Sequence, residues 1–468
     1  MTTSFTWQAV GSWWIFLTDE DVAQRSSGGG GISGVLVDAG VKAVKAGGTV
    51  RKKAGWNTGR RRESRDLTSD IPPGLQQTGD APTLRKLGGV LREVPCTFED
   101  VAWSPDLQDR DRGYLGGLLR FISKCSDPED TKHHQLLTEH ADTPLSEFLT
   151  TVYPLPPFTI ASIHSLTLLT TPPEATPLCT ALDALTRHVS SIGRIPDIRS
   201  AAALTIAYGG SSELCQVWSR GAAVAGGINV LSRGITSITP GADGKHSVAL
   251  SNGEVVTAPW VLTTATTTTA STTTSLAKGI FVISAPLHAL FAKKFADDRI
   301  PPNAAVLTFP CGTLATEDGA RNGYPVYIVA HASATGECGP EECNFLLPTF
   351  PSTRLIPLAV LYTSTLSTQP AGYIFSELAV RRVLSACGEE GADISFVCRY
   401  TQDFATPTAA DVKEGGLVEL SPMSADLAFD AGVVEECKRV YEMVIGTKEG
   451  FLEMTEEMRT QYALAEEE

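Results

Sequence analysis

Apolar residues along the chain repeat with a helical period in some stretches and with a strand-like period in others. They recur every three or four positions over 178–192, which ends at Gly193, and over 430–445, so each stretch predicts an amphipathic helix. Further helices are predicted over 105–125, 144–152, 158–169 and 373–387. Short apolar runs predict strands over 5–16, 90–94, 281–284, 304–309 and 326–330. The pattern therefore predicts a mixed α/β protein, in which the last three strands belong to a second sheet.

The clearest turn lies at Asn252-Gly253. Apolar runs over 247–250 and 254–256 flank it, which predicts a hairpin, and a further strand is predicted over 259–262. The threonine-rich tract that follows, over 263–275, predicts a loop. Asp142 or Thr143 is the expected N-cap of the helix over 144–152.

Residues 25–85 have little apolar periodicity and predict a disordered insertion. Gly29 to Gly34 match the spacing of a dinucleotide-binding loop, but no strand precedes them, and a basic cluster at 51–53 stands where an acidic residue is expected. A flexible linker explains these glycines better. The basic clusters at 51–53 and 60–62 fit a solvated segment better than a nuclear-localisation or phosphate-binding patch.

Composition and charge exclude several classes of protein. The chain has 468 residues, 42% of them hydrophobic and 19% charged, which is enough for two or more domains. A net charge of −15 argues against a general nucleic-acid binder. Ten cysteines without a CxxC pair indicate buried reduced thiols. We find no apolar run of membrane-spanning length and no signal-peptide pattern.

The sequence contains no recognisable catalytic or metal-binding motif. The G-x-S-x-G, phosphate-loop and HExxH patterns are absent. His133, His134 and His140 are expected in a polar linker that would make a poor metal site, and His164 is expected to be a core residue. These observations indicate no catalytic constellation, and we expect neither a metal nor a cofactor.

The most informative stretch runs from Tyr208 to Leu231. Two glycine-rich turns enclose a predicted helix in which Glu213 and Arg220 lie seven residues apart, about two helical turns, so both side chains share a face. Such a face presents an acid and a base to a partner; a surface ion pair between the two is the alternative. Gly226 and Gly227 are expected to end the helix. The run from Ile228 to Leu231 predicts a strand.

This stretch resembles the motif YGxGELxQxFxRxxAxxGGxYxL of the Rab GDP-dissociation inhibitor (GDI) and Rab escort protein family. Four other segments resemble the escort branch, and its fungal members in particular: residues 8–16, 91–101 with 118–121, 145–149, and 324–338. Residues 419–422 and the helix after them resemble the escort C-terminal region. The resemblance covers most of the chain outside residues 25–85 and the threonine tract.

The resemblance implies a flavoprotein-like fold with a mixed-sheet domain I, a smaller helical domain II and an incomplete N-terminal dinucleotide-type unit. The expected organisation is as follows: domain I fragment 1–24, insertion 25–86, domain I strands 87–104, helical domain II 105–192, domain I with the motif 193–262, threonine-rich loop 263–277, second sheet of domain I 278–410, and C-terminal region of domain I with an acidic tail 411–468. About a hundred residues of the family's opening segment are expected before Gln8, and we expect their absence to affect folding and Rab affinity.

The family also implies a function. Its escort members bind GDP-bound, unprenylated Rab GTPases, present them to Rab geranylgeranyltransferase without doing chemistry themselves, and chaperone the lipidated product. We therefore expect a cytoplasmic protein with transient membrane association through Rab delivery. The residues that match the motif, and so are expected at the Rab contact, are Tyr208, Gly210, Glu213, Gln216, Arg220, Gly226, Gly227, Ile228 and Val230.

The family's domain II holds the geranylgeranyl lipid in an apolar pocket. The candidates for such a pocket are Phe121, Phe148, Leu149, Val152, Ile160, Ile163 and Leu166. For each of them, ordinary core packing is the competing interpretation. For the protein as a whole, the alternatives are a Rab GDP-dissociation inhibitor, a flavin-dependent oxidoreductase of the same fold superfamily, and an interaction protein that has lost Rab activity.

Overall fold

The structure is a computed structural model. It describes residues 7–16, 86–95, 98–103, 107–125, 127, 129–192, 204–206, 211–241, 243–264, 273–292, 302–335, 358–367, 369–405, 411–413, 416–427 and 431–451. The predicted disordered insertion lies outside the described residues. The described chain divides into two compact units: unit 1 comprises 1–217 and 276–402, and unit 2 comprises 218–275 and 403–468.

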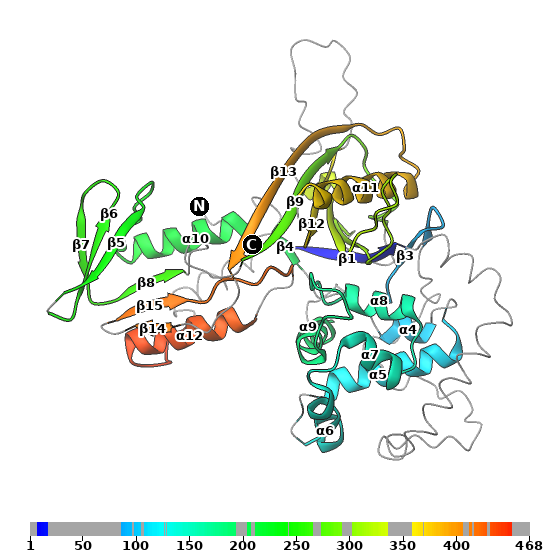
Figure 1. The fold of residues 1–468 in the computed structure, drawn as a ribbon, viewed down its shortest axis with the longest axis horizontal. Coiled ribbons are helices and arrows are strands. Elements are labelled where there is room, and N and C mark those ends of the chain that lie inside the picture. Colours follow the sequence, from blue (N-terminus) through cyan, green and yellow to red (C-terminus); the bar gives the residue numbers. More distant parts are fainter. Residues whose placement is uncertain are drawn as a thin grey trace, which may run out of the picture. The chain divides into compact units, whose positions relative to one another are not determined.

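A nine-stranded sheet is the centre of unit 1 (Figure 1). Its order is β13-β9-β12-β11-β10-β1-β3-β2, and β4 pairs with the start of β1. The strands are β1 Trp7–Phe16, β2 Lys86–Leu87, β3 Leu91–Glu93, β4 Leu204–Ile206, β9 Thr273–Ile283, β10 Ala304–Phe309, β11 Val326–His331, β12 Ala359–Thr365 and β13 Ile394–Ala405. β1 runs parallel to β10 and antiparallel to β3, so the sheet is mixed.

Both faces of this sheet are covered. Trp14 and Ile15 are adjacent on β1 and therefore point to opposite faces, yet both are fully buried. Trp14 packs in a cluster with Phe375 of helix α11 (Ala371–Ala386). Ile15 packs on the other face, with Phe158 of α8 in contact. The apolar runs without alternation in the central strands follow from this two-sided burial.

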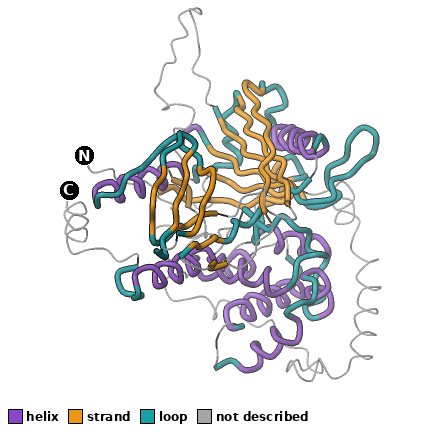
Figure 2. The backbone as a smooth tube through the Cα atoms, turned by 60° about the vertical axis from the view of Figure 1, so that its left-hand side comes forward, coloured by secondary structure: helices purple, strands orange, loops and turns teal. Residues whose placement is uncertain are grey.

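Six helices form the second part of unit 1 and gather on one side of the sheet (Figure 2). They are α4 Phe98–Trp103, α5 Asp109–Lys124, α6 Thr131–His140, α7 Leu145–Thr151, α8 Pro157–Ser165 and α9 Leu178–Ser191. A hydrogen bond from the buried Tyr327 hydroxyl on β11 to the Leu169 carbonyl, 2.8 Å long, joins the sheet to this layer. Leu168, beside that carbonyl, has a positive φ of 57°.

Unit 2 contains two small sheets and a terminal helix. The first has the order β5-β6-β7 (Ile235–Pro240, His246–Leu250, Val255–Ala258), and the second has the order β14-β15-β8 (Asp411–Lys413, Leu417–Leu420, Val261–Thr264). Helix α12 spans Ala431–Ile445. The Asn252-Gly253 hairpin is confirmed, because β6 pairs antiparallel with β7 and Gly253 has a φ of 85°, which favours glycine.

Most of the predicted elements are confirmed. The helix predicted over 178–192 is α9, that over 430–445 is α12, and the strand over 304–309 is β10. The strands over 281–284, 304–309 and 326–330 belong to the nine-stranded sheet, and the hairpin belongs to a different sheet. β1 is also part of the nine-stranded sheet. The division into two contact units does not test the expected domain boundaries, which stay predictions.

Four details of the sequence prediction were wrong. The histidine-rich linker is helix α6, which Asp130 caps by accepting a hydrogen bond from the His133 N–H. Helix α7 has Pro144 at its N-cap in place of Asp142 or Thr143. β9 begins at Thr273, inside the tract predicted as a loop. Ile228–Leu231 forms neither helix nor strand.

Within the described residues, no helix combines the length and the apolar character needed to cross a membrane.

Candidate functional site

The centre of the predicted binding motif is helix α10, Ser211–Val224. The helix ends as its sequence predicts. Gly226 has a φ of 91°, and the N–H groups of Gly226 and Gly227 donate to the carbonyls of Ala223 and Ala222, at 3.1 and 2.8 Å. A side chain at Gly227 would come within 2.9 Å of the Ala222 carbonyl oxygen. Glycine is therefore required here for the turn that redirects the chain after the helix.

Three polar side chains predicted to contact a partner lie on α10. Glu213 is half-buried, whereas Gln216 and Arg220 are exposed. The Gln216 side-chain amide donates to the Glu213 carboxylate over 3.3 Å. No ion pair joins Glu213 to Arg220 within the described part of the chain, and Arg220 makes no ion pair with any other carboxylate described there. The alternative of a surface ion pair is therefore not what the structure shows.

The segment after the helix is exposed. The side chains of Ile228 and Val230 are 88% and 57% exposed, and Gly226 and Gly227 are exposed with them. The Asn229 side-chain amide donates to the carbonyl of Ser219 over 3.0 Å, which places the segment against the turn of α10 that carries Arg220. Tyr208 and Gly210 lie outside the described residues. The structure thus brings Gln216, Arg220, Ile228 and Val230 onto one exposed stretch.

The predicted lipid-pocket residues come together in the helical part of unit 1. Five of them are buried members of one apolar cluster: Phe121, Phe148, Leu149, Ile160 and Ile163. The other two, Val152 and Leu166, are partly buried and pack against this cluster. The Phe148 ring lies 5.5 Å from that of Phe121 and 5.8 Å from that of Tyr153. Burial raises the pKa of the Tyr153 hydroxyl, which keeps it neutral. This packing is what either a core or a lipid-binding site would require.

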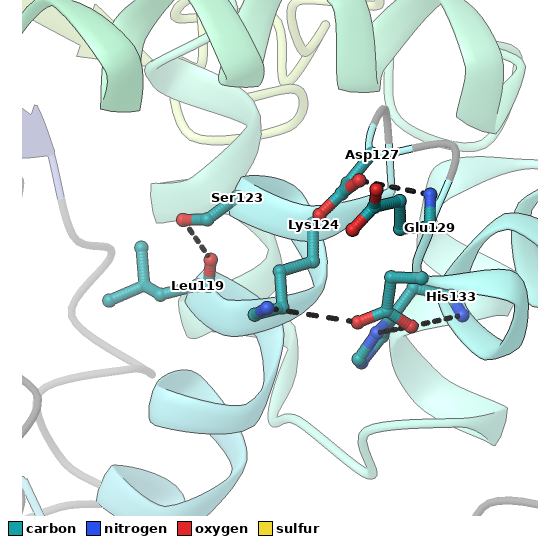
Figure 3. A network of polar contacts seen from close by, with 7 residues as sticks. Leu119, Ser123, Lys124, Asp127, Glu129 and His133 are labelled. Carbon is teal, nitrogen blue, oxygen red and sulfur yellow. Dashed lines mark hydrogen bonds and ion pairs between the residues drawn. The ribbon is translucent and has the colours of Figure 1, made fainter.

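A polar network lies beside this cluster, between α5 and α6 (Figure 3). Nδ1 of His133 is 2.8 Å from Oδ1 of Asp130, and Nζ of Lys124 is 3.9 Å from Oδ2. The side chain and backbone N–H of His133 lower the pKa of the Asp130 carboxyl. The His133 ring also lies 6.0 Å from the Phe121 ring, so α6 contacts the cluster through this histidine as well as through Leu136 and Leu137.

The described residues contain no group of three or more His, Cys, Asp or Glu side chains placed to hold a metal. His164 is buried, as expected for a core histidine.

The sequence prediction missed the exposure of several apolar residues within the motif. Trp218, Val224 and Leu231 are 63%, 83% and 84% exposed. Apolar letters in a helix and a predicted strand normally indicate core positions, so the sequence gave no reason to place these side chains on the surface. Their exposure is the main new observation about the site.

No protein-family profile matches the chain. The chain is 27% identical over 175 residues to Rab proteins geranylgeranyltransferase component A 1 of Caenorhabditis elegans, a match that covers 37% of this chain and 33% of that protein. The fold matches the Rab GDI of Plasmodium falciparum with a TM-score of 0.53 and 13% identity, over 96% of this chain and 78% of that one. The chain is therefore similar to a Rab escort-type protein in part of its sequence and to a Rab GDI in its fold.

The matched Rab GDI has a flavoprotein-like fold, and the mixed sheet of unit 1 with its layer of helices is of that fold class. The aligned part spans about one third of the length of the curated relative. A putative FAD-containing monooxygenase of Photorhabdus luminescens aligns less well, with a TM-score of 0.28 and 9% identity, over 57% of this chain and 72% of that one.

Proposed function

We propose that this chain is a Rab-binding chaperone of the escort type, which holds GDP-bound, unprenylated Rab, presents it to Rab geranylgeranyltransferase and chaperones the prenylated product. The proposed contact surface is α10 with the segment that follows it. The expected contact residues are Tyr208, Gly210, Glu213, Gln216, Arg220, Gly226, Gly227, Ile228 and Val230. The protein supplies binding energy and no chemistry.

The observation that carries the proposal is the exposure of this surface. Arg220 has no acidic partner among the described residues, and Ile228 is 88% exposed, so a polar and an apolar contact are both available to a partner. Exposed apolar residues grouped beside an arginine are typical of protein interfaces. The sequence match to a geranylgeranyltransferase component and the fold match to a Rab GDI support Rab as that partner.

The lipid part of the proposal concerns the helical cluster. A C20 isoprenoid exposed to water costs about 25 cal/mol per Å² of apolar surface, which an apolar site between helices offsets. Phe121 and Phe148 are at the centre of the only apolar cluster in the described residues that is built wholly from helices and their connections. We propose that this cluster opens to receive the geranylgeranyl group.

Direct binding tests the main proposal. Unprenylated Rab, loaded with GDP or with a GTP analogue, is titrated against wild type and against Glu213→Ala/Arg220→Ala. We expect GDP-selective binding that the double variant weakens. Asp243→Ala/Lys245→Ala is the matched control, because it removes an exposed acid and an exposed base outside α10, and these two form their own ion pair at 3.8 Å. Equal weakening in both variants would contradict the assigned surface.

A second assay separates the escort role from that of a GDP-dissociation inhibitor. Rab, Rab geranylgeranyltransferase and geranylgeranyl diphosphate are mixed with and without the protein, and lipid incorporation is measured. An escort protein stimulates incorporation, whereas an inhibitor binds the product without stimulating its formation. A flavin absorbance spectrum in the purified protein would instead favour the oxidoreductase alternative.

A further inference from the structure

Unit 1 contains two large apolar cores with a thinner layer between them. One core lies between the sheet and α11 and includes Trp14, Phe281 and Phe309. The other lies within the helical layer, by which we mean helices α4 to α9 over 98–191, and includes Phe121 and Phe148. All five side chains are fully buried. The sheet with α11 and the helical layer are therefore two bodies, each stabilised by a core of its own.

The layer between these two bodies, called the seam below, holds a small apolar cluster. Its buried members among the described residues are Ile15, Val94, Ala304 and Val306. The backbone of α11 comes close to β11 and β12, whereas no helix of the helical layer comes as close to any described strand. Two parts of one chain are expected to move relative to each other unless a large hydrophobic interface joins them.

A row of polar side chains crosses the sheet at the seam. Thr308 on β10 pairs with Tyr327 on β11, and Tyr327 pairs with Ser364 on β12. Paired residues lie on the same face of a sheet, and Thr308 also pairs with Ile15 of the seam cluster. Thr308 and Ser364 are only 2% and 5% exposed. Hydroxyl groups therefore stand on a buried face where apolar side chains would hold the two bodies together more strongly.

Two of the hydroxyls in this row make no hydrogen bond to the protein. Within the described part of the chain, Oγ1 of Thr308 and Oγ of Ser364 are buried and have no partner. A buried hydroxyl without a protein partner destabilises the closed seam, because water would satisfy the same group in an open one. Tyr327 differs from both, since its hydroxyl donates to the Leu169 carbonyl of the helical layer over 2.8 Å.

The backbone beside this hydrogen bond and the path of the chain both favour opening. Leu168 has a φ of 57°, which a residue other than glycine adopts at a cost in free energy. The chain leaves the sheet after Glu93, at the end of β3, and returns to it at Leu204, at the start of β4. All six helices of the helical layer lie between these two points, so they can move together as one rigid body.

We propose that the helical layer moves away from the sheet as one body, and that the hydrogen bond from Tyr327 to Leu169 holds it in the closed position. Opening gives the hydroxyls of Thr308 and Ser364 access to water, while both apolar cores stay intact. This inference goes beyond the proposed function, because it concerns a motion within unit 1 that requires no partner.

Thiol labelling of two neighbouring sites in the full chain, followed peptide by peptide with mass spectrometry, tests this motion. Ala304 and Ala305 are both fully buried on β10, but Ala304 faces the seam and Ala305 faces the core under α11. A thiol at either site reacts only when its surroundings open. Under native conditions Ala304→Cys should react about tenfold or more faster than Ala305→Cys. Equal rates overturn the proposal, because the seam then opens only when the whole unit unfolds.

Second substitutions in the Ala304→Cys variant test the role of the polar row. Tyr327→Phe removes the hydrogen bond to Leu169 and should speed labelling at position 304 by about fivefold or more. Thr308→Val keeps the shape of the side chain and removes a hydroxyl without a partner, so it should slow labelling there by about threefold or more. Faster labelling with Thr308→Val would mean that this hydroxyl stabilises the closed seam, which contradicts the proposed cause of opening.

Thr363→Val is the matched control. Thr363 neighbours Ser364 on β12 and therefore points to the opposite face, where its hydroxyl donates to the Gly279 carbonyl over 3.4 Å. Because this hydroxyl lies away from the seam, its removal should change labelling at Ala304→Cys by less than about twofold. A change as large as that caused by Tyr327→Phe would mean that labelling reports the stability of the whole unit, and would overturn the proposal.

A second pair of sites serves if β10 does not accept a thiol in place of alanine. Thr308→Cys and Thr363→Cys make the same substitution on opposite faces of the sheet, at sites that are 2% and 3% exposed. Neither adds atoms to a packed site. Thr308→Cys should react about tenfold or more faster than Thr363→Cys. Equal rates at these two sites overturn separate opening of the seam.

Discussion

The two units place their large apolar side chains differently. In unit 1, Trp14, Phe121 and Phe281 are fully buried. In the described part of unit 2, the buried apolar side chains are four valines, at 248, 261, 418 and 440, while Val224, Ile228 and Leu231 are exposed. Unit 1 therefore holds itself together with its own core, and unit 2 offers apolar surface to something else. The two units therefore differ in how much of their large apolar surface they bury, and this difference can be measured.

The largest effect is expected from Phe148→Ala. The substitution removes a fully buried ring from the helical cluster and leaves a cavity, so we expect a loss of about 3–5 kcal/mol in the free energy of unfolding. Chemical denaturation measures it. The matched control is Leu231→Ala, which truncates an exposed side chain of unit 2 and should change the stability by less than about 0.5 kcal/mol. Equal losses of unfolding free energy in the two variants would contradict the difference in burial between the two units.

A smaller effect is expected from Tyr327→Phe. This change keeps the ring and removes the hydroxyl that donates to the Leu169 carbonyl, leaving a buried acceptor without that bond. We expect a loss of about 1–3 kcal/mol in the free energy of unfolding. If this hydrogen bond joins the sheet to the helices, the backbone amide hydrogens of α8 should also exchange with solvent faster in the variant than in wild type. Tyr324→Phe is the control, because that residue is 40% exposed and precedes the same strand.

The smallest effect is expected from Glu377→Gln, and it depends on pH. Arg381 and Arg399, at 2.8 and 2.6 Å, lower the pKa of the Glu377 carboxyl, with the Arg381 hydrogen bond as the main cause. A carboxyl with a folded pKa below its unfolded value of about 4.3 stabilises the protein above that pH, and the contribution is lost as the pH falls through the folded pKa.

Because the Glu377 group is partly exposed, we expect a difference below about 1 kcal/mol between wild type and variant at pH 7. That difference should shrink as the pH is lowered below about 4.3. Denaturation at a series of pH values measures it. A difference that stays constant with pH would mean that the carboxylate's charge contributes nothing.

The sequence predicts the elements of unit 1 better than the binding surface. The apolar run at 304–309 predicts a strand without any knowledge of the neighbouring strands. A strand that is buried on both faces consists of continuous apolar residues, and β10 is such a strand. The helix over 178–192 is likewise apparent from its period alone. Helix α6 was missed because its residues are mostly polar and show no helical apolar period. The ring contacts that its histidines make, with Phe121 and Phe148, cannot be recognised from the sequence.

The candidate site could be located from its motif, but its environment could not. Glu213 and Arg220 were predicted to share a face, and α10 spans both. The apolar letters of Ile228–Leu231 predict a strand, but strand formation also depends on tertiary neighbours, which no local pattern contains. The exposure of Trp218 depends on tertiary neighbours in the same way.

Unit 2 is built from two stretches of sequence separated by the strands and helix of unit 1 that lie between them. β8 pairs with β15 across this gap, and the Ser275 hydroxyl donates to the Asp403 carboxylate from 128 positions away. A ribosome that adds about 5–20 residues per second needs roughly 6–26 s to pass from one of these residues to the other. During that interval the apolar segment around Leu231 has already been synthesised, while the strand that completes its unit has not. Cotranslational folding of this protein therefore includes a period in which this apolar segment is already made and the second stretch of its unit is still missing.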